Sequence, residues 1–278
     1  MYRSFTIILL GFICTIAFSP GVTAQDAEPV EYVFKGTRIV NDQSVNLADK
    51  GELLLLVQHR FGDVSGGYYE LFGLDQATMR LGFEYGFGSF FNAGIGRSTW
   101  LKTYDAFAKL RLVRQTSGFP FTAVISAGGS VPTIRNFFPE PMNSFSDKAS
   151  GNVQLLLAKE TGNFGFQVSP GFIKTGTIAG LNKDLSFFTT GFTGSVKIVR
   201  KVSLNLEYLH AFNKQISGDN TLSLGIDITT GGHLFQLIFS SNQTMLNQGF
   251  YSSKTGSWTS GNIYFGFNLI REFTLKYY

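Results

Sequence analysis

The sequence predicts an all-β protein: an up-and-down antiparallel β-barrel of about twelve strands that crosses a membrane. From residue 51 onward, apolar and polar residues alternate with a period of two, which is typical of strands that bury one face. Most of these segments have the roughly 9–11 residues that a tilted transmembrane strand requires. Long and short connections alternate between them, as in outer-membrane barrels with long extracellular loops and short periplasmic turns. An even strand count would place both ends of the barrel in the periplasm.

The first 24 residues have the layout of a secretory signal peptide. Arg3 supplies a positive start, residues 7–18 are mostly apolar, and Val22-Thr23-Ala24 offers a small-residue cleavage site. The alternative is an uncleaved anchor, although the apolar stretch is shorter than the roughly 20 residues of a membrane helix. Cleavage after Ala24 would remove Cys14, the only cysteine, so we expect a mature chain without disulfides or Cys-ligated metal.

Residues 25–50 are polar and lack the alternation of the later chain. Within them, the stretch 32–40 is compatible with a short strand or a plug. We expect either an N-terminal periplasmic extension, which the composition favours and which would pack at the mouth of the barrel, or a plug. The barrel itself is expected to span residues 51–278.

The strands are predicted from faces that differ in polarity. In residues 220–229, for example, Leu224 and Ile226 fall on one face and Ser223 on the other. A helix would scatter such residues around its axis, whereas a strand gathers each kind on one side. The twelve predicted strands lie near residues 51–62, 75–86, 88–98, 101–114, 120–131, 151–160, 163–172, 187–199, 202–213, 220–229, 233–242 and 261–271.

Composition agrees with a membrane barrel and argues against nucleic acid as a partner. The chain has 29 Phe, 11 Tyr and 32 Gly but only 15% charged residues, which suits many strands with an apolar face. Without Arg3 the mature chain has 22 basic and 19 acidic residues, a net charge of 22 − 19 = +3, and no basic cluster. The expected partners are outer-membrane lipid, the barrel-assembly machinery and small solutes, with no nucleic acid.

Eight segments spread over the mature chain carry a family resemblance. They are FKGTRIVNDQSV (34–45), HRFGDV (59–64), FGLDQATMRLGFEYG (72–86), GIGRST (94–99), KTYDAFAKLRLVRQ (102–115), KVSLNLEY (201–208), LSLGIDITTGGHLFQLIFSS (222–241) and IYFGFNLIREF (263–273). Together they resemble an uncharacterised outer-membrane β-barrel family of the Bacteroidota, a domain of unknown function. The resemblance implies a barrel in the outer membrane and carries over no catalytic or binding residues.

The sequence lacks the common catalytic signatures. It has no G-x-S-x-G elbow or Walker loop, and Gly94-Ile95-Gly96-Arg97-Ser98 lacks the lysine and the following helix of a phosphate loop. The histidines, His59, His210 and His233, show no metal-ligand spacing. We expect no enzymatic activity, no cofactor and no metal. The alternative is a lipid-modifying outer-membrane enzyme whose Ser and His meet on the barrel wall.

Charged strand residues are expected to face the lumen, because Arg or Lys on the lipid side costs about 2–4 kcal/mol at the membrane midplane. The candidate lumen-lining residues are Arg60, Arg80, Glu84, Asp105, Lys109 and Arg111. They make one wall charged, whereas later strands supply mostly neutral polar residues. In one interpretation the bases line a narrow aqueous path and give weak anion preference. In the other, the acids pair with the bases and fill a closed interior.

These patterns favour a small passive channel or transporter for small solutes in the outer membrane. One alternative is a non-conducting structural barrel whose long loops bind a partner, and the second is the lipid-modifying enzyme. Strand number does not decide between an open and a filled lumen, because twelve lies between filled eight-stranded barrels and open sixteen-stranded porins.

Overall fold

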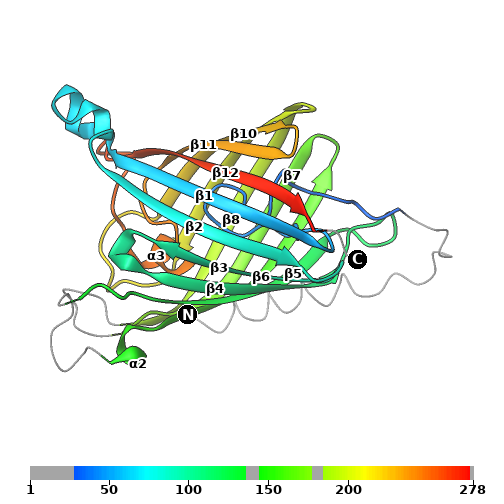
Figure 1. The fold of residues 1–278 in the computed structure, drawn as a ribbon, viewed down its shortest axis with the longest axis horizontal. Coiled ribbons are helices and arrows are strands. Elements are labelled where there is room, and N and C mark those ends of the chain that lie inside the picture. The colour runs from blue at the N-terminus through cyan, green and yellow to red at the C-terminus, as the bar shows by residue number, and fades with distance from the viewer. Residues whose placement is uncertain (1–27, 136–143, 177–183, 276–278) are drawn as a thin grey trace, which may run out of the picture.

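The computed structural model describes residues 28–135, 144–176 and 184–275. The predicted signal peptide, residues 1–24, lies outside the described residues. The described chain forms one barrel whose strands run obliquely around a common axis (Figure 1). Within that part of the chain, no helix is both long and apolar enough to cross a membrane.

Twelve strands build the wall, and each lies where the sequence predicts one. They are β1 (Glu52–Asp63), β2 (Ala77–Gly86), β3 (Phe91–Ser98), β4 (Tyr104–Val113), β5 (Thr122–Val131), β6 (Ser150–Thr161), β7 (Phe164–Lys174), β8 (Ser186–Val199), β9 (Val202–Ala211), β10 (Thr221–Thr230), β11 (His233–Ser240) and β12 (Tyr264–Thr274). Strand ends differ from the predicted ones by at most three residues, as at the start of β3, which is 91 rather than 88. The alternating pattern therefore locates strands well and their ends less well.

The strands close into a single ring in which neighbours along the chain pair antiparallel. β1 pairs with both β2 and β12, so the first and last strands complete the ring. A closed ring leaves no edge strand with unpaired backbone groups, which is the condition for crossing a bilayer with strands. The predicted fold class, a twelve-stranded up-and-down antiparallel β-barrel, is confirmed.

The connections sort by length between the two ends of the barrel. At the short-turn end, the β10–β11 turn consists of Gly231 and Gly232, whose φ angles of 41° and 84° suit a tight hairpin. The long-loop end carries the helical turns η1 (Val64–Gly73), η2 (Trp100–Lys102), α2 (Phe145–Lys148) and α3 (Asn247–Ser252). The short β3–β4 link, which η2 occupies, is the exception that the sequence also shows. Loop parity is thus a property of the folded barrel.

The outer surface of the barrel is apolar and the inner surface is polar. On β10 and β11, Leu224 and Phe239 are 44% and 40% exposed, whereas Ser223 and Ser240 are fully buried. A water-soluble protein would bury its large apolar residues and expose its serines. The inverted pattern fits a wall whose outer face lies against lipid.

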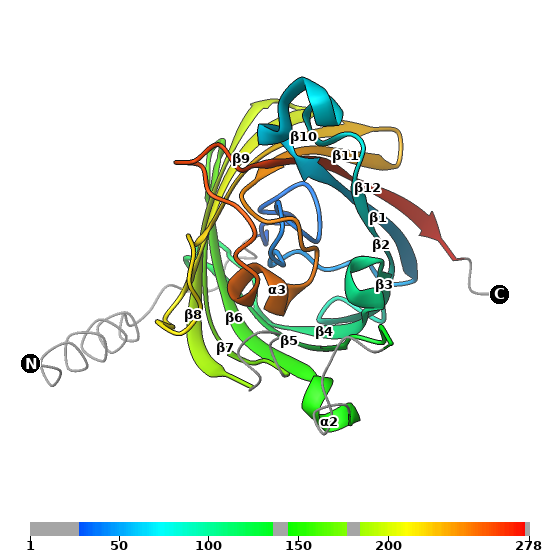
Figure 2. The ribbon, with the colours of Figure 1, turned by 90° about the vertical axis from the view of Figure 1, so that its left-hand side faces the viewer.

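The lumen is occupied by parts of the chain itself. Figure 2, which looks along the barrel, shows the N-terminal region and α3 within the ring of strands. Residues 33–48, here called the lumen segment, are buried except for the half-buried Lys35. The sequence favours packing of residues 25–50 at the mouth of the barrel. The structure places residues 33–48 deeper, within the ring of strands (Figure 2). Leu54 and Leu56 of β1 face inward and pack in one apolar cluster with Ala48.

Lipid exposure of the outer face can be tested in the middle of β10. We expect Ile226→Arg to lower the free energy of unfolding by about 2–4 kcal/mol, because a cation at the midplane loses its hydration. Thr230→Arg, on the same face but at the strand end, should cost only about 0–1 kcal/mol. Denaturant titrations of the barrel in lipid vesicles measure both values. Equal losses would show that β10 does not cross the bilayer in this register.

Candidate functional site

The lumen segment contacts strands on every side of the ring. Its hydrogen-bond partners come from nine of the strands. They are Arg60 of β1, Glu84 of β2, Lys109 of β4, Gln154 of β6, Gln167 of β7, Glu207 of β9, Ser223 of β10, Gln236 of β11 and Asn268 of β12. Only an element within the ring can reach all of them, so the lumen and its contents form the candidate site.

A tight turn forms the tip of the lumen segment. The amide of Ile39 donates to the carbonyl of Asp42 at 3.1 Å, and the turn residues Asn41 and Asp42 are types that favour turns. The amides of Asn41 and Asp42 both donate to the carboxylate of Glu207, at 3.2 and 3.0 Å. Glu207 is fully buried, so it requires hydrogen-bond donors, and the turn supplies them from the main chain.

Glutamine side chains of the wall form hydrogen bonds with the main chain of the lumen segment. Gln236 Nε2 donates to the carbonyl of Ile39 at 2.6 Å. Gln167 accepts from the amide of Val45 at 3.0 Å and donates to the carbonyl of Gln43 at 2.7 Å. An amide side chain carries both a donor and an acceptor, so it can pair a backbone that has no neighbouring strand. The wall therefore replaces the sheet partner that this segment lacks.

Lys109 holds the segment from the side of β4. Its Nζ donates to the carbonyls of Asn46, Thr37 and Ser44, at 2.6, 3.2 and 3.4 Å. The same Nζ lies 3.5 Å from Oε1 of Glu84, and both side chains are fully buried. Thr37 Oγ1 donates to the other oxygen of Glu84 at 2.8 Å. One buried ion pair thus neutralises its own charges and also binds the lumen segment.

A second ion pair lies across β3. Arg80 of β2 donates through Nε and one terminal nitrogen to both oxygens of Asp105 on β4, at 2.9 and 2.5 Å. The intervening β3 residue is Gly96, where an added Cβ would lie 2.3 Å from the guanidinium of Arg80. Because Gly96 has no side chain, it leaves room on the inner face of β3 for Arg80 to reach Asp105.

The remaining predicted residues, Arg60 and Arg111, lie at different depths. Arg60 is fully buried, and its terminal nitrogens donate to Asn41 Oδ1 at 3.1 Å and Asn268 Oδ1 at 3.0 Å. Arg111 is half-buried near the short-turn end, where it donates to the carbonyl of Ser89 at 2.7 Å. Of the six predicted residues, three bind the lumen segment: Arg60, Glu84 and Lys109. Arg80 and Asp105 pair with each other in the wall, and Arg111 lies at the mouth.

Two hydrogen bonds fix the chain where it enters the lumen at the short-turn mouth. Tyr32 donates its hydroxyl to Asp49 at 2.5 Å, and burial together with this bond raises the pKa of Tyr32. Lys35 Nζ donates to the carbonyl of Arg200 at 2.6 Å, and burial with the nearby charge of Lys197 lowers its pKa. A cavity of about 190 Å³ remains between these residues and the ends of β1 and β12.

The connection that carries α3 covers the lumen segment from the long-loop end. Gln154 of β6 donates to Asp42 at 3.1 Å and to the hydroxyl of Tyr251 at 3.3 Å, and accepts from Asn247 at 2.6 Å. Phe250 and Tyr251 are 1% exposed. The cavity between this connection and the lumen segment has a volume of about 20 Å³, which is room for about one water molecule. Two layers of chain therefore occlude the barrel.

The histidines lie on the outer face of the barrel. His59 stacks among aromatic rings, His210 lies 2.8 Å from the amide nitrogen of Asn220, and His233 contacts Arg271. In the described ranges no histidine is bonded to a serine, and no cluster of potential ligands could hold a metal ion. This geometry gives no support to the alternative of a lipid hydrolase.

Sequence reasoning did not identify the tip of the lumen segment as part of the site. Asn41, Asp42 and Gln43 form the run N-D-Q in a polar stretch, and nothing in that stretch reveals its partner Glu207, 166 residues away from Asn41. The available signal was Glu207, an acidic residue on the inward face of β9 with no basic residue near it in the sequence pattern. An inward carboxylate with no strand partner indicates that something else enters the lumen.

The buried Lys109–Glu84 pair can be tested by removing one charge and then both. Lys109→Met should lower the free energy of unfolding by about 3–5 kcal/mol, because it leaves Glu84 buried and uncompensated. Adding Glu84→Gln should recover part of the loss. Denaturant titration measures the stability of each variant. If the double variant is no more stable than the single one, the ion pair does not govern the stability of this wall.

The chain is similar to several solved outer-membrane proteins at low sequence identity. No curated protein matches the chain. It is similar to a NanC porin, with 9% identity over 79% of this chain and 98% of that chain and a TM-score of 0.49. It is also similar to the outer membrane protein Omp33 of Acinetobacter baumannii, with 12% identity over 81% of this chain and 99% of that chain and a TM-score of 0.44. A third similar structure is an outer membrane channel of Pseudomonas putida F1, with 10% identity over 82% of this chain and 97% of that chain and a TM-score of 0.48. The family described as Membrane bound beta barrel domain (DUF5777) matches residues 34–273, from the lumen segment to the last strand, and the chain belongs to that family.

Proposed function

We propose that this protein is an outer-membrane barrel that passes small solutes and that its own lumen segment closes it at rest. Membership of a membrane barrel family, the signal-peptide layout and the loop parity support the location. With the short-turn end in the periplasm, the lumen segment enters from the periplasm and α3 covers it from outside.

The observation that carries the proposal is that a polar, charged wall is occluded by one segment of the same chain. The two buried ion pairs, Arg80–Asp105 and Lys109–Glu84, join wall residues to each other. They would stay paired if the segment left. Glu207, by contrast, would exchange the segment's amides for water, at a net cost of about 0.5–1.5 kcal/mol per hydrogen bond. The emptied wall would therefore suit an aqueous path.

The closed state is favoured at rest by apolar contacts. Ile39, Val40 and Val45 of the lumen segment belong to one buried cluster with wall residues such as Leu156 and Ile238. Exposing them to a hydrated lumen would cost free energy in proportion to the apolar area. Opening in this proposal is therefore a rare or triggered event, not the resting state of a porin.

The wall carries inward charges of both signs, which predicts weak ion selectivity. The bases are Arg60, Arg80, Lys109, Arg111 and Lys197, and the acids are Glu52, Glu84, Asp105, Glu160, Glu207, Asp227 and Glu272. The acids of β9 and β10 lie opposite the basic wall, so the anion preference expected from β1, β2 and β4 alone should be small. Mixed charges hold water in the path without excluding either sign of ion.

A non-conducting barrel remains the second candidate, and α3 is the observation that favours it. Phe250 and Tyr251 pack with Ile173, Phe187 and Leu209 inside the long-loop end. If this connection is fixed, the barrel stays closed even without the lumen segment. The long loops would then be the functional surface.

Planar-bilayer conductance separates the two candidates. Mature protein should be mostly silent, and deletion of residues 28–48 should give steady openings, because the main obstruction is gone. The deletion variant must still migrate faster unheated than boiled, which shows that its barrel is closed. A folded deletion variant that carries no current would sink the channel and leave the non-conducting barrel.

A reversible lock tests the same idea in a full-length chain. Residues 25–278 contain no cysteine, and Nδ2 of Asn41 lies 2.8 Å from Oγ of Ser223. We expect Asn41→Cys with Ser223→Cys to abolish the rare openings when oxidised and to regain them with reductant. Ser223→Cys alone is the matched control and should not respond. Openings that persist in the cross-linked protein would mean that current does not require the segment to move.

A further inference from the structure

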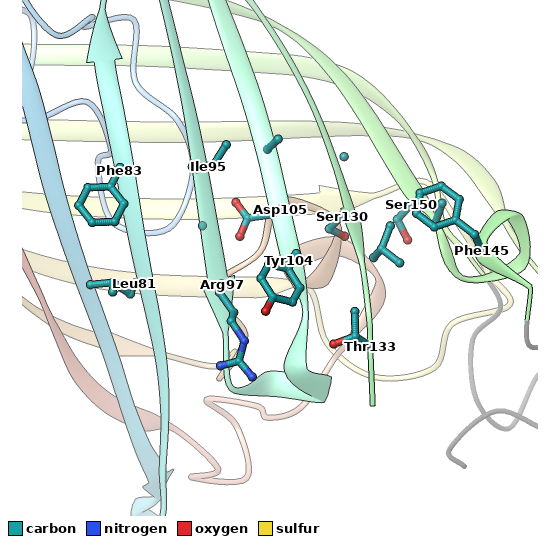
Figure 3. A pocket seen from close by; sticks show the side chains of 15 residues that line it. Leu81, Phe83, Ile95, Arg97, Tyr104, Asp105, Ser130, Thr133, Phe145 and Ser150 are labelled. Atoms are coloured by element: carbon teal, nitrogen blue, oxygen red, sulfur yellow. The ribbon is translucent and has the colours of Figure 1, made fainter. Parts of the chain in front are cut away.

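The outer face of the barrel carries an apolar groove near the long-loop end. It runs across β2 to β5 and has a volume of about 830 Å³ (Figure 3). Its floor consists of small outward residues, Ala106 on β4 and Gly129 on β5, and larger side chains such as Phe83 and Ile95 border it. The volume lies within the roughly 300–1,000 Å³ of small-molecule sites. This surface lies against lipid in a membrane barrel, so the lipid itself is the available ligand.

The groove is separate from the lumen. Asp105 and Ser130 touch it, but their neighbours on the same strands, Tyr104 and Val131, are the ones that face outward. Asp105 is held by Arg80 on the lumen side. A ligand in the groove would therefore not enter the conduction path.

Positive charge gathers at the polar end of the groove. Arg97 on β3 is exposed, and its guanidinium lies 5.5 Å from the ring of Tyr104. No carboxylate pairs with Arg97 anywhere in the described part of the chain. Lys102 in η2 and Arg135 after β5 add exposed positive charge at the same end. A lipid-facing arginine is tolerated near an interface, where it meets lipid phosphates rather than acyl chains.

We infer that this groove binds a phosphorylated glycolipid of the outer leaflet, of the acylated glucosamine phosphate type. One acyl chain lies over Ala106 and Gly129, and Arg97 binds the phosphate. A guanidinium pairs with phosphate through two parallel hydrogen bonds, which suits it better than the headgroup hydroxyls of a neutral lipid. The inference rests on the outer-membrane location proposed above and not on conduction.

The experiment measures binding of defined lipids to the purified mature protein in neutral detergent, by native mass spectrometry. The probes are bisphosphorylated lipid A, the same lipid after dephosphorylation, and phosphatidylglycerol. Wild type should prefer the first by roughly tenfold over its dephosphorylated form, the scale of a charge-assisted contact. It should also prefer the first over phosphatidylglycerol, whose phosphodiester carries a single negative charge. Arg97→Gln should abolish this preference. Lys159→Gln, which removes an exposed outward charge near the short-turn end of β6, should leave it intact.

A second pair of variants tests the apolar part of the groove. Ala106→Trp should weaken binding of both forms of lipid A, because the indole fills the floor. Ala93→Trp, also outward but further along β3 toward the short turns, should bind as wild type does.

Three results would overturn the inference. These are equal binding of phosphatidylglycerol, an Arg97→Gln variant that keeps the phosphate preference, and dimers of the protein that Ala106→Trp disperses. The last would make a second copy the occupant. Cell fractionation and bilayer current, measured on the same variants, report the location and the channel independently of this site.

Discussion

The interior of this barrel depends on one constraint: a polar wall that closes on itself must find partners for its buried groups. In this ring of twelve strands, the lumen holds the lumen segment and the connection that carries α3 (Figure 2). Glu207 shows the consequence, since its carboxylate is fully buried and receives donors from the amides of Asn41 and Asp42. The lumen segment thus satisfies hydrogen-bonding groups of the wall that the pairing between strands leaves without partners.

The polar contacts divide into two classes with different consequences. The pairs Arg80–Asp105 and Lys109–Glu84 are internal to β2, β3 and β4 and require only the wall. The contacts of Gln167 and Gln236 join the wall to the lumen segment and exist only while the segment is present. In the proposed channel, changes in the first class would act on the stability of the barrel, and changes in the second class would act on how long the segment stays in the lumen. Lys109 belongs to both classes, because it pairs with Glu84 and also donates to carbonyls of the lumen segment.

Local patterning predicted the strands, and long-range contacts account for what it missed. Alternation with period two is a property of each strand alone, so all twelve were found with ends accurate to three residues. The lumen segment has no such period, because its partners, such as Asn268 for Val40, are up to 228 positions distant. Arg111 shares the inward parity of Lys109, but parity gives the face and not the depth. Depth follows from where the strand ends, which is the least certain part of a sequence pattern.

The wall made by β2 to β5 serves two surfaces because small residues thin it on both sides. Gly96 on the lumen side leaves room for Arg80 to reach Asp105, and Ala106 and Gly129 on the lipid side leave the groove. Asp105 and Ala106 are adjacent on β4, so the ion pair and the groove floor are separated by one thickness of backbone. A shift of one residue in the β3–β4 register would turn Asp105 toward lipid and would remove the floor at the same time. One strand register therefore sets the positions of both the buried charges and the outer groove.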